Sequence, residues 1–356
     1  MAAYADITGW GKCMPPAILT NDAIASVIDT TDEWIKTRSG IAERRVSHVS
    51  VSDMATVAGQ RALAAADISS SEVDLLIVAT CTPDTVIPST AAHVQRKIGA
   101  SNAAVFDLNA GCSGFIYGLS VATAMIRSAA YKKVLVIGAE RVTWFLNWAV
   151  RDTAVLFGDG SGAVVLEPSE QESGLLYSHL GCEGEAADAL HLPNFGTAKN
   201  RFADDYDLFE HHFDGREIFR RAVKGMAYET NIVLDELGLS KDDIDLLIPH
   251  QANLRIIESL AKYLSIDMSK VEVNIQKYGN TSAATIPVAM VEALAAGRIK
   301  AGDRVLLAAF GAGLTRAAGL LRWGARTTPL KQSDAKLTPC DRTGLEILSG
   351  AIKHTN

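Results

Sequence analysis

Residues 107–118, DLNAGCSGFIYG, carry the turn around which the chain is organised. The residues just before them, 103–106, form a short apolar run that predicts a buried strand. Gly111 predicts a tight turn, and the small and apolar residues from Gly114 to Met125 are typical of a buried helix. Cys112 is therefore expected at a strand-to-helix turn, where unpaired N–H groups and the helix dipole favour a thiolate. Two interpretations remain open from this stretch: a nucleophile, or a small side chain packed in a turn.

The composition is that of a globular protein. The chain has 356 residues, of which 48% are hydrophobic and 21% are charged, and its net charge is −7. This acidic balance gives no sign of a nucleic-acid partner. Five scattered cysteines without paired spacing fit a reducing compartment, so we expect a cytoplasmic protein. No signal peptide, membrane-spanning run or metal-ligand cluster is evident in the sequence.

Short runs rich in Val, Ile and Leu alternate with helical stretches, which is typical of an α/β fold whose strands are buried on both faces. These runs recur in the same order. Residues 74–77 (DLLI) repeat at 245–248, 134–136 (VLV) match 305–307 (VLL), and 163–166 (AVVL) match 318–321 (AGLL). We infer a duplicated α/β unit with halves at residues 1–170 and 171–325, followed by a tail at 326–356.

The duplication predicts which polar side chains meet. Residues 111–113 align with 279–281, so two halves related by a pseudo-two-fold axis would place Cys112 and Asn280 at equivalent strand-to-helix turns. His250 follows the predicted strand 246–248, at the end where α/β sheets bind ligands. We therefore expect the three side chains to share one crevice, with Cys112 as a nucleophile. Taken singly, His250 also fits a satisfied core histidine, and Asn280 fits an ordinary turn residue.

Five motifs carry a resemblance to a known family. They are TDEWI (31–35) with RSGI (38–41), NAGCSGF (109–115), LFGDG (156–160), HQAN (250–253) and YGNTSA (278–283). With them, residues 4–325 resemble β-ketoacyl-acyl-carrier-protein synthase III, a family of acyltransferases among the thiolase-superfamily condensing enzymes. The resemblance implies thiolase-like halves in α-β-α-β-α layers. It also implies a decarboxylating Claisen condensation of an acyl-CoA primer with malonyl-acyl-carrier protein, through an acyl-Cys intermediate, that initiates fatty acid biosynthesis.

The resemblance gives each catalytic residue a role. Cys112 would carry the acyl group, and its N–H would form the oxyanion hole together with the N–H of Ala312. His250 and Asn280 would donate hydrogen bonds to the nascent enolate. The thioesters of CoA and phosphopantetheine are substrates, so no cofactor is expected. The glycine-rich run 158–163 precedes a predicted strand, which is the wrong context for a dinucleotide site.

Other residues match family positions along the substrate arm. The resemblance implies that Trp34 and Arg151 hold the adenine of CoA, that Arg38 lies toward its phosphates, and that Gly215 and Asn253 lie along the pantetheine. An aromatic face and a guanidinium plane suit a base. Each of these side chains also fits an ordinary position at the surface or in the core.

Several features bear on the acyl group and on assembly. Ile87 matches the position that closes the acyl pocket, which in the family comes from the partner in a homodimer. Trp144, Phe145 and Trp148 add aromatic bulk before Arg151, and with Ile87 they favour a primer longer or more branched than acetyl-CoA. The apolar run 103–106 is a place where the sheets of two subunits would join. We also expect the acidic, aromatic loop 204–213 to cover the site.

A basic stripe follows Gly215. Arg216, Arg220 and Lys224 recur at helical spacing with Arg221 beside them, opposite an apolar stripe. Like charges at this spacing destabilise a helix, so on an acidic protein they suggest an anionic partner. We predict that Arg220, Arg221 and Arg255 dock the acyl-carrier protein. The alternative is a solvated basic face.

Three other functions compete with this interpretation. The first is a related condensing enzyme of polyketide or of specialised, medium-chain acyl metabolism. The second is a Cys-His-Asn hydrolase, against which the duplication argues. The third is a non-catalytic acyl-CoA-binding protein, against which the presence of Cys112, His250 and Asn280 argues.

Overall fold

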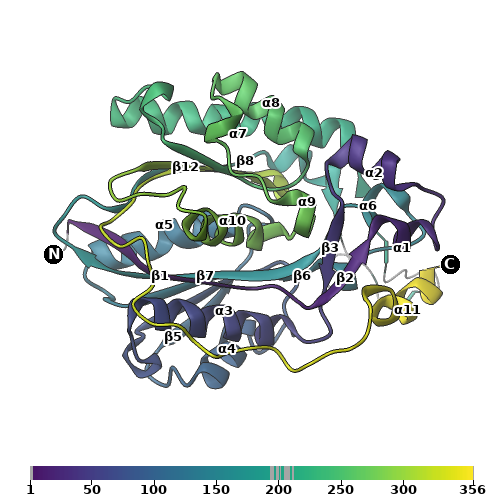
Figure 1. The fold of residues 1–356 in the computed structure, drawn as a ribbon, viewed down its shortest axis with the longest axis horizontal. Helices are drawn as coiled ribbons and strands as arrows, with labels where there is room; N and C mark the ends of the chain where they lie inside the picture. The colour runs from purple at the N-terminus through teal and green to yellow at the C-terminus, as the bar shows by residue number, and fades with distance from the viewer. Residues whose placement is uncertain are drawn as a thin grey trace.

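Five layers of secondary structure, in the order α-β-α-β-α, make up the fold (Figure 1). The computed structural model describes residues 3–192, 196–197, 200, 202–203, 209–210 and 212–355. The main helices lie in pairs: above, between and below the two sheet layers in the view of Figure 1. These pairs are α7 (Gly215–Leu237) with α8 (Leu254–Leu264), α5 (Gly114–Arg127) with α10 (Thr285–Ala295), and α3 (Val51–Ala66) with α4 (Thr90–Ile98). The predicted layered, thiolase-like α/β fold is confirmed.

Hydrogen bonds connect the strands of both sheet layers in the order β11-β12-β13-β8-β1-β7-β6-β4-β5. β8 and β1 are joined by a single residue pair, Ala5 with Gly174, and this narrow link lies between the two layers. The strands are β1 (Tyr4–Cys13), β4 (Leu75–Ala79), β5 (Ala104–Leu108), β6 (Val134–Arg141), β7 (Asp159–Ser169), β8 (Gly174–Cys182), β11 (Leu246–Pro249), β12 (Arg304–Gly311) and β13 (Thr315–Arg322).

The sequence repeat appears in the strand pairing. β4 pairs in parallel with β6, and β6 pairs antiparallel with β7; β11, β12 and β13 repeat this arrangement. Leu75 lies opposite Val134, and Leu246 lies opposite Val305, which are aligned positions of the repeat. The duplication is thus confirmed, while the boundaries at 170/171 and 325/326 stay a prediction.

The repeat breaks down locally before Asn280. β5 precedes Cys112 as predicted, although its residues are exposed or half-buried in this chain and not buried as expected, because β5 is the edge strand. The equivalent strand of the second half is reduced to one bridge between Leu247 and Val271. A short helix, α9 (Ile275–Tyr278), then leads into Asn280 through Gly279, whose φ of 64° suits glycine. The prediction that Asn280 lies at a strand-to-helix turn is therefore wrong. The edge strand that would precede the turn is reduced to one bridge, and the short helix α9 precedes Asn280 instead.

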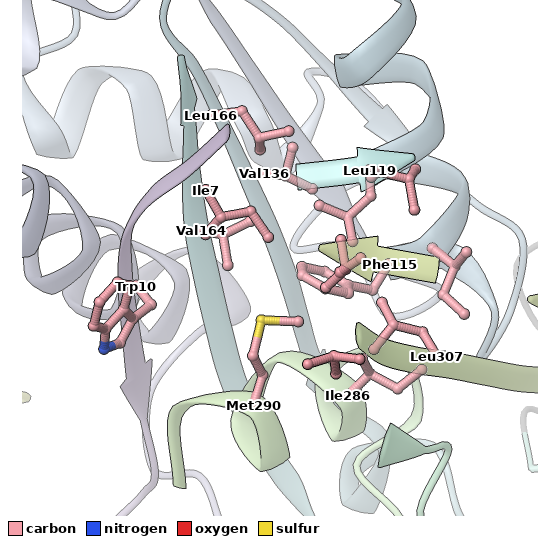
Figure 2. Close-up of a cluster of buried hydrophobic side chains, with 14 of the residues drawn as sticks. Ile7, Trp10, Phe115, Leu119, Val136, Val164, Leu166, Ile286, Met290 and Leu307 are labelled. Carbon is pink, nitrogen blue, oxygen red and sulfur yellow. The ribbon is translucent and has the colours of Figure 1, made fainter. Parts of the chain in front are cut away.

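The two halves pack together in the middle layer. Figure 2 shows Phe115 and Leu119 of α5 in one buried cluster with Ile286 and Met290 of α10 and Leu307 of β12. Burying a side chain of this size contributes about 1.5–3 kcal/mol. Because α5 begins directly after Cys112, this core fixes the position of the thiol.

The tail continues along the first half. After β13 it crosses α3, where Lys331 pairs with Asp67 at 2.6 Å. It ends in α11 (Gly344–Thr355), whose Leu348 and Ile352 are buried in the same cluster as Trp148. The tail is therefore an ordered part of the described structure.

The remaining elements are short. They are β2 (Ala17–Thr20), α1 (Asn21–Ala25), α2 (Asp32–Ser39), β3 (Glu43–Val46), α6 (Arg151–Ala154), β9 (Leu190–His191) and β10 (His212–Phe213), with 3₁₀ turns between them. In the part of the chain that the structure describes, no helix has the length and apolar character needed to cross a membrane.

Candidate active site

A cavity of about 830 Å³ is lined by residues of both halves. Cys112 reaches it from the first half, and His250 and Asn280 reach it from the second. Their exposed fractions are 9%, 2% and 6%, respectively. The structure therefore brings together the three side chains that the sequence singled out, and it shields them from bulk water.

Two backbone turns meet at Cys112 with no room for side chains. A Cβ added at Gly311 would lie 2.5 Å from the Cys112 nitrogen, and a Cβ added at Gly111 would lie 2.9 Å from the Ala312 nitrogen. The two turns that carry the Cys112 and Ala312 nitrogens are therefore in close contact. That these two N–H groups form an oxyanion hole stays a prediction. Ala312 does not have a positive φ, so alanine causes no backbone strain at this position.

The Cys112 thiol differs from its predicted state. Burial raises its pKa to about 12, a hydrogen bond with the Ser282 side chain partly opposes the rise, and the Glu140 carboxylate adds to it. The expected thiolate is therefore not the resting form of the free protein. Burial in the cavity outweighs the N-terminus of α5, which begins at Gly114 just beyond the thiol.

His250 is a neutral imidazole. Burial lowers its pKa to about 3. Its Nδ1 lies 2.7 Å from the hydroxyl oxygen of Thr285, and its backbone N–H donates to the Ala308 carbonyl at 2.8 Å. A neutral imidazole next to a protonated thiol can donate or accept a hydrogen bond without burying a charge.

Asn280 presents a hydrogen-bond donor to the cavity. Its Oδ1 accepts a hydrogen bond from the Ser282 N–H at 2.8 Å, so the amide nitrogen is the atom left to donate. Its backbone N–H donates to the Leu156 carbonyl, and its own carbonyl accepts from the Gly158 N–H. These two bonds tie the Asn280 turn to the first half of the chain.

The residues expected to hold the adenine lie together. The Arg151 guanidinium is 4.5 Å and the Arg38 guanidinium 5.0 Å from the Trp34 ring centroid. Trp34 and Arg38 line the cavity, while Arg151 donates to the Asp29 carbonyl at 3.3 Å. A base inserted between Trp34 and Arg151 needs roughly 3.5 Å on each side. Arg151 would therefore have to move outward to admit an adenine.

Gly215 and Asn253 also line the cavity, where α7 and α8 begin. The Asn253 side chain has structural partners: its Oδ1 accepts from the Arg255 N–H at 2.9 Å, and its Nδ2 donates to the Arg38 carbonyl at 3.0 Å. It therefore caps α8 and ties that helix to α2. Contact of either residue with pantetheine stays a prediction.

The aromatic segment before Arg151 does not line the cavity. Trp148 is only 1% exposed, and its indole N–H donates to the Thr143 carbonyl, while Trp144 lies at the surface beside Arg141. Ile87 is 87% exposed and lies outside the cavity of its own chain. The prediction that Trp144, Phe145 and Trp148 bear on the acyl group is not supported by this cavity, because none of them lines it and Trp148 packs into the core with α11. The apolar wall comes instead from Leu156, Phe157, Phe213, Ile218, Phe219, Ala222, Met226 and Phe310.

Part of the predicted covering loop can be placed. His212 and Phe213 line the cavity. Residues 204–208 and 211 of that loop lie outside the described residues.

The predicted basic stripe is partly neutralised. Arg220 and Arg221 both pair with Glu217 at 2.6 Å, and Arg221 also pairs with Glu183. Arg255 lines the cavity, with its guanidinium 5.7 Å from the Phe219 ring. Glu217 lies at helical spacing from both arginines and was visible in the sequence, whereas Glu183 is distant along the chain and was not.

Two polar residues around the site, Glu140 and Thr285, escaped the sequence analysis. Glu140 is fully buried at the end of β6, and burial raises its pKa although it accepts hydrogen bonds from Thr82 at 2.5 Å and Ser282 at 3.0 Å. Thr285 contacts His250. A glutamate that ends the apolar run 134–139 was the available signal for Glu140, because a buried charge needs partners.

The chain is similar to known proteins over most of its length. Residues 106–184 and 234–323 match the families described as 3-Oxoacyl-[acyl-carrier-protein (ACP)] synthase III and its C terminal. The Beta-ketoacyl-[acyl-carrier-protein] synthase III 2 of Vibrio vulnificus is 55% identical over 99% of this chain and 98% of its own. The synthase III of Roseiflexus sp. is 48% identical over 91% of this chain and 100% of its own. The crystal structure of the synthase III from Aquifex aeolicus is 45% identical with a TM-score of 0.84, covering 90% of this chain and 100% of that one.

Proposed function

The chain belongs to the 3-oxoacyl-[acyl-carrier-protein] synthase III family, and from this we infer that it condenses an acyl-CoA with malonyl-acyl-carrier protein to initiate fatty acid biosynthesis. The observation that carries this function is the meeting of Cys112, His250 and Asn280 in one shielded cavity. Both substrates are thioesters, so the reaction needs no resident cofactor or metal.

In the first half of the reaction, Cys112 Sγ attacks the acyl-CoA carbonyl. The bond from the acyl carbon to the CoA sulfur breaks, CoA leaves as its thiol with the proton from Cys112, and an acyl-Cys112 thioester remains. The N–H groups of Cys112 and Ala312 would stabilise the oxyanion of the tetrahedral intermediate. Because Cys112 rests as a thiol, its proton has to leave as the new C–S bond forms.

In the second half, the malonyl thioester loses CO2 and becomes an enolate. The imidazole of His250 and the amide of Asn280 would donate hydrogen bonds to the enolate oxygen. The enolate carbon then attacks the carbonyl of acyl-Cys112, a C–C bond forms as the acyl C–S bond breaks, and Cys112 leaves as a thiolate that takes a proton from water. Neutral donors suit this step, because negative charge develops on the thioester oxygen only as CO2 departs.

Arg255 is the best-supported docking residue for the acyl-carrier protein, because it lies at the cavity and has no acidic partner among the described residues. Arg220 and Arg221 remain in the proposal with smaller roles, since Glu217 partly neutralises both. Arg255→Glu should raise the KM for malonyl-acyl-carrier protein far more than the KM for acyl-CoA. Lys241→Glu, beyond the other end of α7, is the matched control. Equal effects of Arg255→Glu on both substrates would contradict docking.

A homodimer, cytoplasmic location and a primer longer or more branched than acetyl-CoA complete the proposal. The edge strand β5 and the exposed Ile87 support a dimer, and five free thiols support a reducing compartment. Sedimentation should give twice the chain mass.

The apolar cavity wall, with Met226 and Phe310, supports the longer primer. A primer panel that shows acetyl-CoA preferred over C4–C8 acyl-CoAs would contradict the primer proposal.

One experiment tests the reaction itself. The protein is mixed with acyl-CoA and then with malonyl-acyl-carrier protein, and each step is followed by mass spectrometry. We expect an acyl adduct on Cys112 and then a carrier-bound 3-oxoacyl product, with neither in Cys112→Ala. Acylation followed only by hydrolysis would instead support the hydrolase, which forms no C–C bond.

A further inference from the structure

Ser282 connects the two groups that would face the enolate. Its N–H donates to Asn280 Oδ1 at 2.8 Å, and its carbonyl oxygen lies 3.0 Å from the Thr285 hydroxyl. The Thr285 oxygen in turn lies 2.7 Å from Nδ1 of His250. The side chains of Asn280 and His250, 30 residues apart in the sequence, are therefore both hydrogen-bonded to one short segment, residues 282–285.

The backbone of Ser282 is strained. Its φ is 50°, in the left-handed region that few residues other than glycine adopt, and the residue is buried. Such a conformation is unfavourable and persists only where the surroundings impose it. Here the Ser282 hydroxyl donates to the buried Glu140 carboxylate at 3.0 Å. Glu140 thus anchors the strained residue from the first half of the chain.

The Thr285 hydroxyl suits either neutral form of His250. When its proton points to the Ser282 carbonyl, its oxygen accepts a hydrogen bond from Nδ1–H of the imidazole. When the proton points to Nδ1, the hydrogen of the ring lies on Nε2, the form that donates to an enolate. In both states the ring keeps a partner, and its orientation is held.

We propose that Ser282 and Thr285 are positioning residues, which hold Asn280 and His250 in the geometry that decarboxylation requires. This inference rests on the proposed condensation. It assigns their contacts with Asn280 and His250 to the decarboxylation half of the reaction. Acylation of Cys112 depends on the thiol and on the N–H groups of Cys112 and Ala312. Among the described residues the Thr285 hydroxyl contacts His250 and the Ser282 carbonyl, whereas the Ser282 side chain also hydrogen-bonds the thiol, so Thr285 separates the two half-reactions.

The test compares Thr285→Val with Thr285→Ser and measures both half-reactions. Thr285→Val should lower the rate of malonyl-acyl-carrier-protein decarboxylation and the kcat of condensation by about tenfold to a hundredfold, as expected for a misplaced group. The KM values and the rate of Cys112 acylation should stay within about twofold of wild type. Thr285→Ser keeps the hydroxyl and should restore most of the activity.

Thr230→Val is the matched control. Thr230 is also a buried helical threonine, but its hydroxyl has no hydrogen-bond partner in the described structure. This variant should leave both half-reactions unchanged. Ser282→Ala, which removes the link to Glu140 and keeps the backbone groups, provides a second route if Thr285→Val does not fold. It should lower decarboxylation as Thr285→Val does, and it is compared on decarboxylation alone because the Ser282 side chain also hydrogen-bonds the Cys112 thiol.

The outcomes separate this inference from the proposed function. Unchanged decarboxylation in both Thr285→Val and Ser282→Ala would overturn the positioning role. Equal loss of acylation and decarboxylation, without rescue by Thr285→Ser, would also overturn it, because that pattern indicates a general structural defect. Wild-type protein that forms no C–C bond would instead refute the condensation itself.

Discussion

The protonation of the Cys112–His250 pair gives the sharpest prediction. Burial raises the pKa of the thiol from 9.0 to about 12 and lowers that of the imidazole to about 3. At pH 8 a thiol with a pKa of 12 is ionised to about one part in 10⁴, whereas one with a pKa of 9 is ionised to about a tenth. Three pKa units correspond to about 4 kcal/mol against the thiolate. We therefore expect a neutral pair in the free protein throughout pH 5–9.

Alkylation of Cys112 by iodoacetamide measures this state directly, because the thiolate is the reacting form. The rate should rise about tenfold per pH unit from pH 7 to 10, without a plateau. Peptide mass spectrometry separates Cys112 from the other four cysteines, and the exposed Cys182 serves as an internal reference for the reagent. Glu140→Gln should speed the alkylation at a fixed pH, since the Glu140 carboxylate contributes to the raised pKa.

A plateau between pH 5 and 8 would refute this reasoning. It would indicate a thiolate–imidazolium pair, such as a Cys-His-Asn hydrolase uses, and would show that the N-terminus of α5 outweighs burial. A rate in Glu140→Gln that is no faster than wild type would show that the carboxylate does not act on the thiol. The pH series and the variant therefore test burial and charge separately.

Three further predictions concern other parts of the molecule. Gly311→Ala places a Cβ 2.5 Å from the Cys112 nitrogen, so the rate of Cys112 acylation should fall at least tenfold while the fold, followed by circular dichroism, is retained; unchanged acylation would show that the turn can yield. Asn280→Ala should lower malonyl-acyl-carrier-protein decarboxylation by about 10²–10³-fold and leave acylation intact, and a loss below threefold would exclude Asn280 as an enolate donor. Leu348→Ala should lower the free energy of unfolding by about 2–5 kcal/mol in urea titrations, whereas the exposed Leu330→Ala should have little effect; similar values for both would show that α11 does not contribute to the core.

Much of the fold could be predicted from local patterns. Runs such as 75–79 and 305–309 are apolar throughout, because strands buried on both faces have no polar side. Their recurrence in a fixed order predicted the duplication, and the strand registers agree with it. The second half diverges before Asn280, where the edge strand shrinks to one bridge. The repeat alone could not reveal that change, since aligned positions need not keep the same backbone.

The location of the candidate site was also predictable. Cys112 and His250 each follow a strand, and the duplication predicted that they would meet Asn280; the three side chains line one cavity although the backbone before Asn280 differs from the prediction. The surroundings of the site were less accessible. The sequence predicts that Trp148 bears on the acyl group, but Trp148 packs into the core with α11. It also predicts that Arg221 is available to dock an anionic partner, but Arg221 pairs with Glu183. Both errors involve partners far away in the sequence.

The alternation of strands and helices and the duplication could be derived from the sequence alone, because they follow from local apolar patterns. The sequence also singled out Cys112, His250 and Asn280 as the candidate residues of the site. The tertiary structure alone decided their chemical state. The pKa values of Cys112 and His250 depend on burial by both halves, and the orientations of Asn280 and His250 depend on residues 282–285. Desolvation and hydrogen bonds between distant segments exist only once the chain has folded. The turn at Cys112 could therefore be found in the sequence, but whether its sulfur carries a proton could not.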